Sequence, residues 1–116
     1  SLSREQVRWI LTLNLTYPIK VPRRDLANGF LLAEILSRYH PSEVAMHSYA
    51  TGTSSKVKAA NWGLLEKALR KKGFALGKTE AADVRAADSD AVFALLERLR
   101  KWLTGGAAVG RAAAAP

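Results

Sequence analysis

The sequence predicts a single all-α domain, and three observations support this prediction. A chain of 116 residues, 48% of them apolar, can bury one core, whereas a second domain would need about 100 more residues. Apolar residues recur at helical spacing in four long segments. No segment shows sustained alternation of apolar and polar residues, which disfavours strands. We therefore expect four main helices joined by short connecting helices.

The first helix is expected over about residues 3–13. Ser3 and Gln6 have the spacing of a capping box, and apolar residues follow at helical spacing. Residues 14–24 contain Pro18 and Pro22, whose fixed φ and missing N–H oppose regular structure. This segment is predicted to be an ordered connector.

The second helix is predicted to begin at a cap formed by Asp25 and to end before Pro41, which cannot continue it. Its apolar stripe is Leu32, Ile35, Leu36 and Tyr39. Residues 42–53 lack periodicity and are predicted to form a loop with one helical turn.

The third helix is predicted to begin at Ser54 or Ser55 and to stop at Gly73. Asn61 falls on its apolar face, where an amide must find hydrogen-bond partners. We expect it to tie this helix to the backbone of a neighbouring loop. Tryptophans at positions 9, 62 and 102 lie in or beside apolar stripes, which favours a structural role for each.

Thr79 can cap a short helix that reaches Arg85, and Asp88 or Ser89 can start the last main helix. That helix carries Val92, Leu95, Leu96, Leu99 and Leu103 on one face. The domain is expected to span residues 1–103, followed by a flexible Gly/Ala-rich tail over 104–116. The predicted core includes Trp9, Leu32, Leu36, Leu64, Leu95 and Leu99.

The sequence contains no residue pattern typical of a catalytic, metal or phosphate-binding site. Without cysteine there is no thiolate nucleophile or thiolate metal site, and His40 and His47 are too far apart along the chain for a typical zinc site. Residues 73–79 resemble a phosphate-binding loop but are one residue short and follow a helix, so they indicate a helix stop and a helix start. No catalytic triad is visible. We expect no enzyme activity, cofactor, metal or small-molecule substrate.

No apolar run approaches the length that spans a bilayer, and residue 1 begins a polar segment rather than a signal peptide. We expect a cytoplasmic chain without a membrane partner.

The whole chain has a net charge of +8, and its positive charge is concentrated in two segments. Residues 1–24 carry five cations and one anion, and residues 56–78 carry seven and one. Residues 79–97 carry one cation and five anions. This excess predicts an anionic partner such as DNA or a microtubule, although solvated surface is the simpler alternative.

The cations that we expect to carry binding form two groups. The first basic cluster is Lys20, Arg23, Arg24, Lys56 and Lys58, and the second basic cluster is Arg70, Lys71 and Lys72.

Four sequence motifs, in this order along the chain, resemble those of a known family. They are RDLANGFLLAEI at residues 24–35, YHP at 39–41, MHSY at 46–49 and KAANWG at 58–63. Over about residues 3–103 the sequence resembles the calponin-homology-like domain of the sperm flagellar protein family, also called CLAMP, and of its spermatogenesis-associated relatives.

The resemblance implies an all-helical domain of cilia and flagella that binds microtubules rather than actin. It places the protein on the cytoskeleton of the axoneme, where other axonemal proteins are further candidate partners. Asn28 and Gly29 would mark the turn into the central helix. Dimerisation would reside in a C-terminal coiled coil, which this sequence does not contain.

Three alternatives remain open at this level. Actin binding follows from the wider calponin-homology fold. Docking of a ciliary partner's helix would require an apolar patch on the folded surface. Nucleic-acid binding follows from charge alone and lacks a recognised groove-reading motif.

Overall fold

The computed structural model describes residues 2–105, and this part of the chain contains helices and no strand. The four long helices are α1 (Arg4–Thr12), α3 (Phe30–Tyr39), α4 (Ser55–Lys71) and α6 (Ser89–Leu103). Shorter elements connect them, namely α2 (Pro22–Asp25), η1 (Pro41–Glu43), η2 (Met46–Ser48) and α5 (Glu80–Arg85). The predicted all-α class and its four main helices are confirmed. Of the expected tail over 104–116, residues 106–116 lie outside the described residues.

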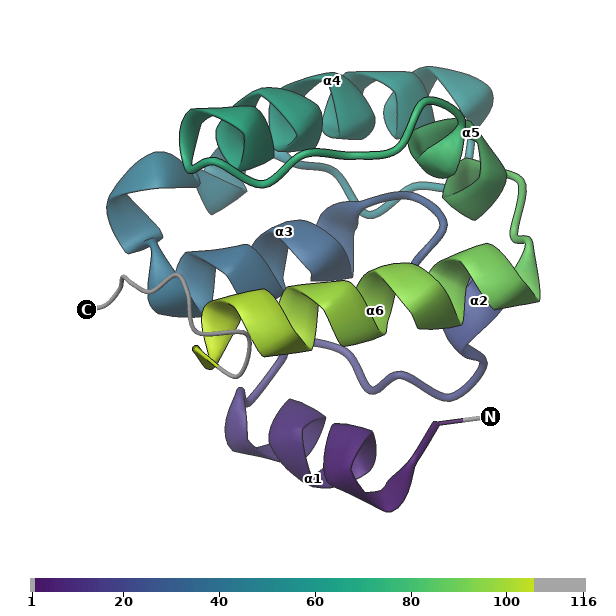
Figure 1. The fold of residues 1–116 in the computed structure, drawn as a ribbon. Helices are drawn as coiled ribbons and strands as arrows, with labels where there is room; N and C mark the ends of the chain where they lie inside the picture. The colour runs from purple at the N-terminus through teal and green to yellow at the C-terminus, as the bar shows by residue number, and fades with distance from the viewer. Residues whose placement is uncertain (1, 106–116) are drawn as a thin grey trace.

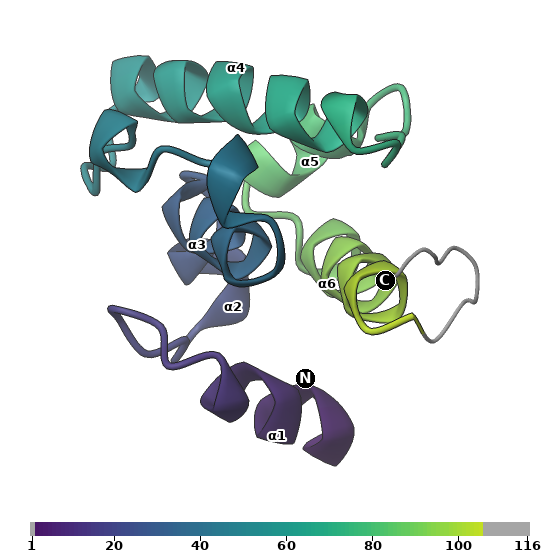
Figure 2. The ribbon, with the colours of Figure 1, turned by 90° about the vertical axis from the view of Figure 1, so that its left-hand side faces the viewer.

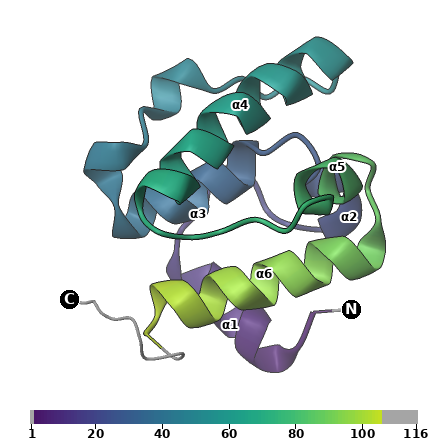
Figure 3. The same ribbon diagram turned by 45° about the horizontal axis from the view of Figure 1, so that its top comes forward.

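The long helices form three levels (Figure 1). Helix α4 covers one side of α3 and α6, and α1 lies on the opposite side, as Figure 2 also shows. Helices α3, α4 and α6 all begin at the same end of the molecule, beside α2 and α5 (Figures 1 and 3). Both short helices contact α6. The domain therefore has one end where long helices begin and one where they finish.

The core lies between these levels and is apolar. Trp62, Ile35, Leu36, Leu95 and Leu96 are among its fully buried side chains. Burying a side chain of this size stabilises the fold by about 1.5–3 kcal/mol.

Five of the six predicted core residues are buried, and Leu64 is the exception. Helix α4 turns Leu65 and Leu69 inward, so Leu64 points about 100° away from this stripe and is 40% exposed. The prediction for Leu64 is wrong because the third helix carries more apolar residues than its buried face uses.

Capping explains where three long helices begin. At α1, the N–H of Gln6 donates to Ser3 Oγ (3.1 Å) and the N–H of Ser3 donates to Gln6 Oε1 (2.8 Å), which confirms the capping box. Ser54 caps α4 by accepting from the N–H of Val57, and Asp88 caps α6 by accepting from the N–H of Ala91. The predicted starts of these helices are confirmed.

Gly73 ends α4 as predicted, with a φ of +91°. The N–H of Phe74 donates to the carbonyl of Leu69 (2.9 Å), and that of Gly73 to the carbonyl of Arg70 (3.0 Å), which forms a Schellman motif. Residues 73–79 thus form a helix stop followed by the start of α5. Thr79 precedes α5, but its hydroxyl donates to Asp83 Oδ2 (3.0 Å) instead of capping the backbone.

The predicted cap at Asp25 is wrong, because α3 begins five residues later. Asp25 closes α2, and its Oδ2 accepts from the N–H groups of Lys20 and Val21 at 2.8 Å each. Pro22 opens α2 at a position where its missing N–H is not needed. The connector therefore contains one helical turn that its prolines were expected to prevent.

The turn into α3 lies at Asn28 and Gly29, as the resemblance implies. Gly29 has a φ of +83°, and Asn28 Oδ1 accepts from the N–H of Phe30 (3.0 Å). A Cβ at Gly29 would come within 3.3 Å of Trp62 Nε1. Glycine is thus required here by both backbone conformation and space.

Candidate functional site

A hollow of about 540 Å³ lies at the end of the molecule where α3, α4 and α6 begin. Segments distant in sequence converge on it: the proline connector, α2, the start of α3, the loop before α4, α4 itself and the turn before α6. Its walls include Tyr17, Pro18, Arg24, Asn28, Phe30, Thr51, Thr53, Lys58 and Ala87. We refer to it as the hollow.

The hollow brings together Arg24 of α2 and Lys58 of α4, two members of the first basic cluster. Arg24 Nε donates to Asp25 Oδ1 (3.2 Å), and no hydrogen bond or ion pair of its terminal nitrogens is found within residues 2–105. Lys58 is half-buried and forms no ion pair in that range. The terminal nitrogens of Arg24 and the ammonium group of Lys58 can therefore donate hydrogen bonds to a ligand.

Asp25 also lines the hollow, and its carboxylate is occupied by the protein. Burial raises the pKa of Asp25, but hydrogen bonds from the N–H groups of Val21 and Lys20 and from Arg24 outweigh this effect and hold the pKa below its ordinary value. Both oxygens accept these bonds. The carboxylate thus shapes α2 rather than offering a free acceptor to the hollow.

The other three members of the first basic cluster are exposed. Arg23 belongs to α2, Lys20 precedes it, and Lys56 lies in the first turn of α4. None forms an ion pair among residues 2–105. The structure therefore places unpaired cations on the segments that surround the hollow.

Two asparagines fix the walls of the hollow. Asn61 Nδ2 donates to the carbonyls of Ala50 (2.7 Å) and Asn28 (2.9 Å), and its Oδ1 accepts from the N–H of Ala50 (3.0 Å). Asn28 Nδ2 in turn donates to the carbonyl of Gly52 (2.9 Å). The prediction that Asn61 ties its helix to a loop is confirmed, and that loop is a wall of the hollow.

Trp62 of α4 supports the same region from within the core. Its indole N–H donates to the carbonyl of Ala27 (2.8 Å), and the side chain is fully buried. Trp9 Nε1 donates to Tyr39 Oη (2.8 Å) on the other side of the core. Both tryptophans have the structural role that the sequence predicts.

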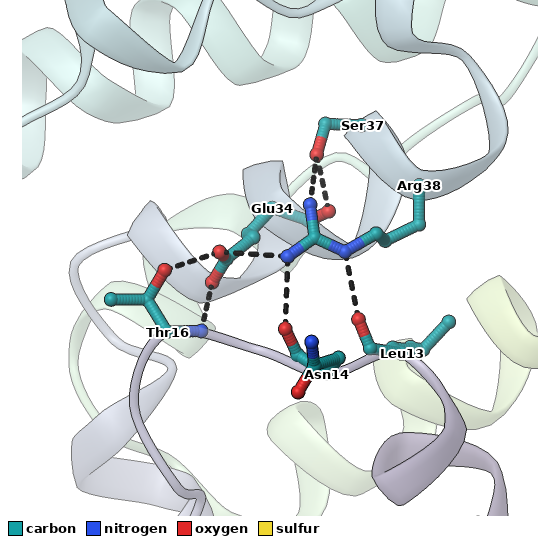
Figure 4. A network of polar contacts seen from close by, with 6 residues as sticks. All are labelled: Leu13, Asn14, Thr16, Glu34, Ser37 and Arg38. Atoms are coloured by element: carbon teal, nitrogen blue, oxygen red, sulfur yellow. Dashed lines mark hydrogen bonds and ion pairs between the residues drawn. The ribbon is translucent and has the colours of Figure 1, made fainter.

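A buried carboxylate holds the proline connector against α3 (Figure 4). Glu34 accepts from the N–H of Thr16 (3.0 Å), from its hydroxyl (2.5 Å) and from Arg38 Nη2 (3.1 Å). Arg38 also donates to the carbonyls of Leu13 (2.7 Å) and Asn14 (3.0 Å). This network fixes the chain just before Tyr17, where it reaches the hollow.

The second basic cluster lies at the other end of α4. Lys58 and Arg70 are twelve residues apart, or about 18 Å along the helix axis. All three members are exposed, and Lys71 Nζ pairs with Glu43 Oε1 at 3.1 Å. The two clusters therefore do not converge on one site, although Lys56 and Arg70 fall on the same outer side of α4.

Sequence reasoning missed Lys67 and Glu34. Lys67 is exposed on that outer side of α4, because a rotation of about 100° per residue places it roughly 20° from Lys56 and about 60° from Arg70 around the helix axis. Glu34 could have been noticed as a carboxylate inside an apolar stripe four residues before an arginine, the same signal that identified Asn61.

Aromatic side chains close the end of the molecule where the long helices finish. The rings of Trp102 and Phe74 lie 5.0 Å apart, and His40 lies 5.8 Å from Trp102. Burial, with a smaller contribution from nearby Lys72, lowers the pKa of His40. Trp102 thus packs with neighbouring rings, as predicted.

An apolar patch is exposed beside α1. Leu11 is 74% exposed, Tyr17 47% and Val7 41%, and these residues border a second depression of about 320 Å³. A patch of this kind was the expected sign of a protein-docking module.

Residues 2–105 contain no group of three or more His, Asp or Glu side chains that could hold a metal ion. In the same range, no helix has the length and apolar content needed to cross a membrane.

Comparison with known proteins identifies the family. A family model described as the CH-like domain in sperm protein matches residues 6–101. Sperm flagellar protein 1 of Homo sapiens is 34% identical over 64 residues, which is 55% of this chain and 27% of that protein. The Xenopus laevis protein of the same name is 35% identical over 74 residues (63% and 32%), and the Mus musculus protein 36% over 69 residues (59% and 30%).

The matched segments thus cover about a third or less of these relatives' own length. The family match, in contrast, extends over most of this chain and over all six α-helices at least in part. It agrees with the all-helical architecture and with the ordered stretches around Asn28 and Asn61. This chain belongs to the family of CH-like domains found in sperm proteins.

Proposed function

We propose that this domain is a non-enzymatic microtubule-binding module of cilia or flagella, and that it docks on tubulin through the first basic cluster. The observation that carries the proposal is that Arg24 of α2 and Lys58 of α4 line one hollow, with Lys20, Arg23 and Lys56 on the segments around it. The acidic tubulin lattice is the partner that this charge favours, because cations clustered on a surface attract an anionic polymer. The names of the relatives support a flagellar setting.

The test is cosedimentation with microtubules over a salt series. The variant replaces Arg23, Arg24, Lys56 and Lys58 by alanine, and the matched control replaces Arg4, Arg8, Lys78 and Lys101, four exposed cations outside both clusters. One exposed charge pair contributes about 0.2–1 kcal/mol, so four together contribute about 0.8–4 kcal/mol and should change the affinity about fourfold or more. The control should change it much less.

Two results would contradict the proposal. Equal losses in the two quadruple variants would show that net charge alone matters, and absence of pelleting at low salt would remove microtubules as the partner. A parallel series with actin filaments decides the actin alternative, because the first basic cluster should matter only for the filament that the domain recognises.

The apolar patch beside α1 favours a second candidate function, docking of another cytoskeletal protein. Val7, Leu11 and Tyr17 expose apolar surface next to a depression, as a groove for a partner's helix would. Leu11→Asp should abolish such an interaction and leave microtubule pelleting unchanged, because Leu11 lies outside the first basic cluster.

A further inference from the structure

We propose that the hollow is a binding site for a flexible, carboxylate-rich peptide, namely the acidic tail of tubulin, rather than a contact for the folded lattice. This inference rests on the proposed function and specifies which part of the partner the first basic cluster holds. The site is the space between Arg24 and Lys58, and its ligand is an extended acidic segment that brings one carboxylate between them.

The shape of the hollow suits a peptide. Its volume of about 540 Å³ lies within the range of about 300–1,000 Å³ that is typical of ligand sites. A folded surface such as the tubulin lattice is too broad to enter a space of this size, whereas an extended chain can place single side chains in it. The hollow is therefore matched to a segment that leaves the lattice.

The chemistry of the walls suits glutamate next to an apolar or aromatic residue. Arg24 and Lys58 offer charged donors, and the hydroxyls of Thr51 and Thr53 can bond a peptide backbone. Tyr17 and Phe30, whose rings lie 6.0 Å apart, form an apolar wall. Cations and an apolar wall together distinguish an acidic peptide from a fully apolar helix.

The electrostatic field at this end favours a negative ligand further. Helices α3 and α4 begin here with no acidic residue in their first turns, so the positive ends of their dipoles add to the two side chains, whereas Asp88 and Asp90 offset the dipole of α6. The hydrogen bonds of Asn28 and Asn61 hold the walls before any ligand arrives. A preformed site loses less entropy on binding than one that must be ordered.

The decisive variant fills the hollow without removing a charge. Thr53→Trp places a bulky ring at its exposed rim, and Ser42→Trp adds the same ring to η1, which does not line the hollow. The probe is a fluorescein-labelled peptide of glutamates that ends in tyrosine, with a glutamine peptide as control, and binding is followed by fluorescence anisotropy. We expect Thr53→Trp to weaken glutamate-peptide binding at least tenfold and Ser42→Trp to leave it unchanged.

A charge variant and trimmed microtubules complete the test. Lys58→Ala should weaken peptide binding about fivefold, as expected for one partly buried charge contact. On intact microtubules Thr53→Trp should pellet less than the unmodified domain, and on microtubules whose tails have been removed by protease the two should pellet alike.

The two proposals fail in different ways. If Thr53→Trp and Ser42→Trp bind the glutamate peptide equally, the hollow is not the site, and microtubule binding through the lattice stands. If the domain pellets with trimmed and intact microtubules to the same extent, the tail is not the ligand. If it pellets with neither, the proposed function is wrong, and peptide binding alone then decides what the hollow holds.

Discussion

The two ends of this domain each carry a cluster of cations but are built differently. At the end with the hollow, Arg24 of α2 and Lys58 of α4 line a space whose walls are fixed by the side-chain amides of Asn28 and Asn61. At the other end, Arg70, Lys71 and Lys72 lie where α4 finishes, Phe74 and Trp102 pack their rings together, and Lys71 is already paired with Glu43. Charge therefore does not define a site by itself, because a site also needs a shaped surface that holds the charges in place.

The largest expected effect comes from breaking the wall of the hollow. Asn61→Leu keeps the branched shape and the number of side-chain heavy atoms but removes three hydrogen bonds and leaves the N–H and carbonyl of Ala50 and the carbonyl of Asn28 without their partner. Each unsatisfied buried group costs about 1–3 kcal/mol, so we expect a loss of roughly 3–4 kcal/mol in the free energy of unfolding after partial relaxation. Urea denaturation measures this loss.

The matched control is Leu64→Asn, the reverse exchange at an exposed site on the same helix, which should change stability by less than about 0.5 kcal/mol. Comparable losses in the two variants would show that Asn61 is not the residue that fixes the loop.

The next effect concerns the connector that brings Tyr17 to the hollow. Glu34→Ala removes the acceptor for the N–H of Thr16 and for Arg38, and we expect a loss of roughly 2–3 kcal/mol in unfolding free energy. Hydrogen exchange should show faster opening of residues 14–17 than of α6. Glu66→Ala, a half-buried glutamate of α4 outside this network, should leave exchange in the connector unchanged; equal acceleration in both would contradict the role of Glu34.

These two residues show how far the sequence leads. Asn61 is predictable because a polar residue on an apolar helix face needs hydrogen-bond partners, and the structure supplies these partners. Glu34 follows the same rule, but the apolar residues on both sides of it make the signal weaker in the sequence. Helix starts at Ser3, Ser54 and Asp88 were predictable because a cap is a local interaction.

The hollow itself could not be predicted from sequence. It requires the proline connector, α2 and α4 to meet, and their approach depends on tertiary packing that no local pattern encodes. For the same reason Asp25 was assigned to the wrong helix, since its carboxylate bonds backward to Lys20 and Val21 instead of forward. The prediction that these cations bind stays a proposal. The sequence already separates the two clusters along the third helix, and the structure adds that Arg24 of α2 meets Lys58 at the hollow.

A third prediction compares the two ends directly. Alanine at Arg70, Lys71 and Lys72 and alanine at Arg23, Arg24 and Lys58 each remove three positive charges. The first triple variant should weaken microtubule binding less than threefold, because these cations do not converge on one site, and the second should weaken it about tenfold. Cosedimentation at one fixed salt concentration measures both. Equal losses would mean that the ends contribute alike through net charge.

The smallest effect is a pH dependence at the aromatic end. The folded-state pKa of His40 is lowered by burial and by Lys72, so the unfolded chain holds its proton more tightly than the folded one. Stability associated with His40 is therefore present above its unfolded pKa of about 6.5 and is lost as the pH falls through its lower folded value. Thermal unfolding between pH 8 and pH 5 should show a small fall in the midpoint temperature, and His40→Asn should remove this fall.

The control is His47→Asn, at an exposed position in η2, which should keep the fall in midpoint. If His47→Asn removed the fall instead, the titrating group would lie outside the aromatic end. Because Lys72 is the cation that acts on His40, Lys72→Ala should shrink the fall without abolishing it, which ties this part of the second basic cluster to stability.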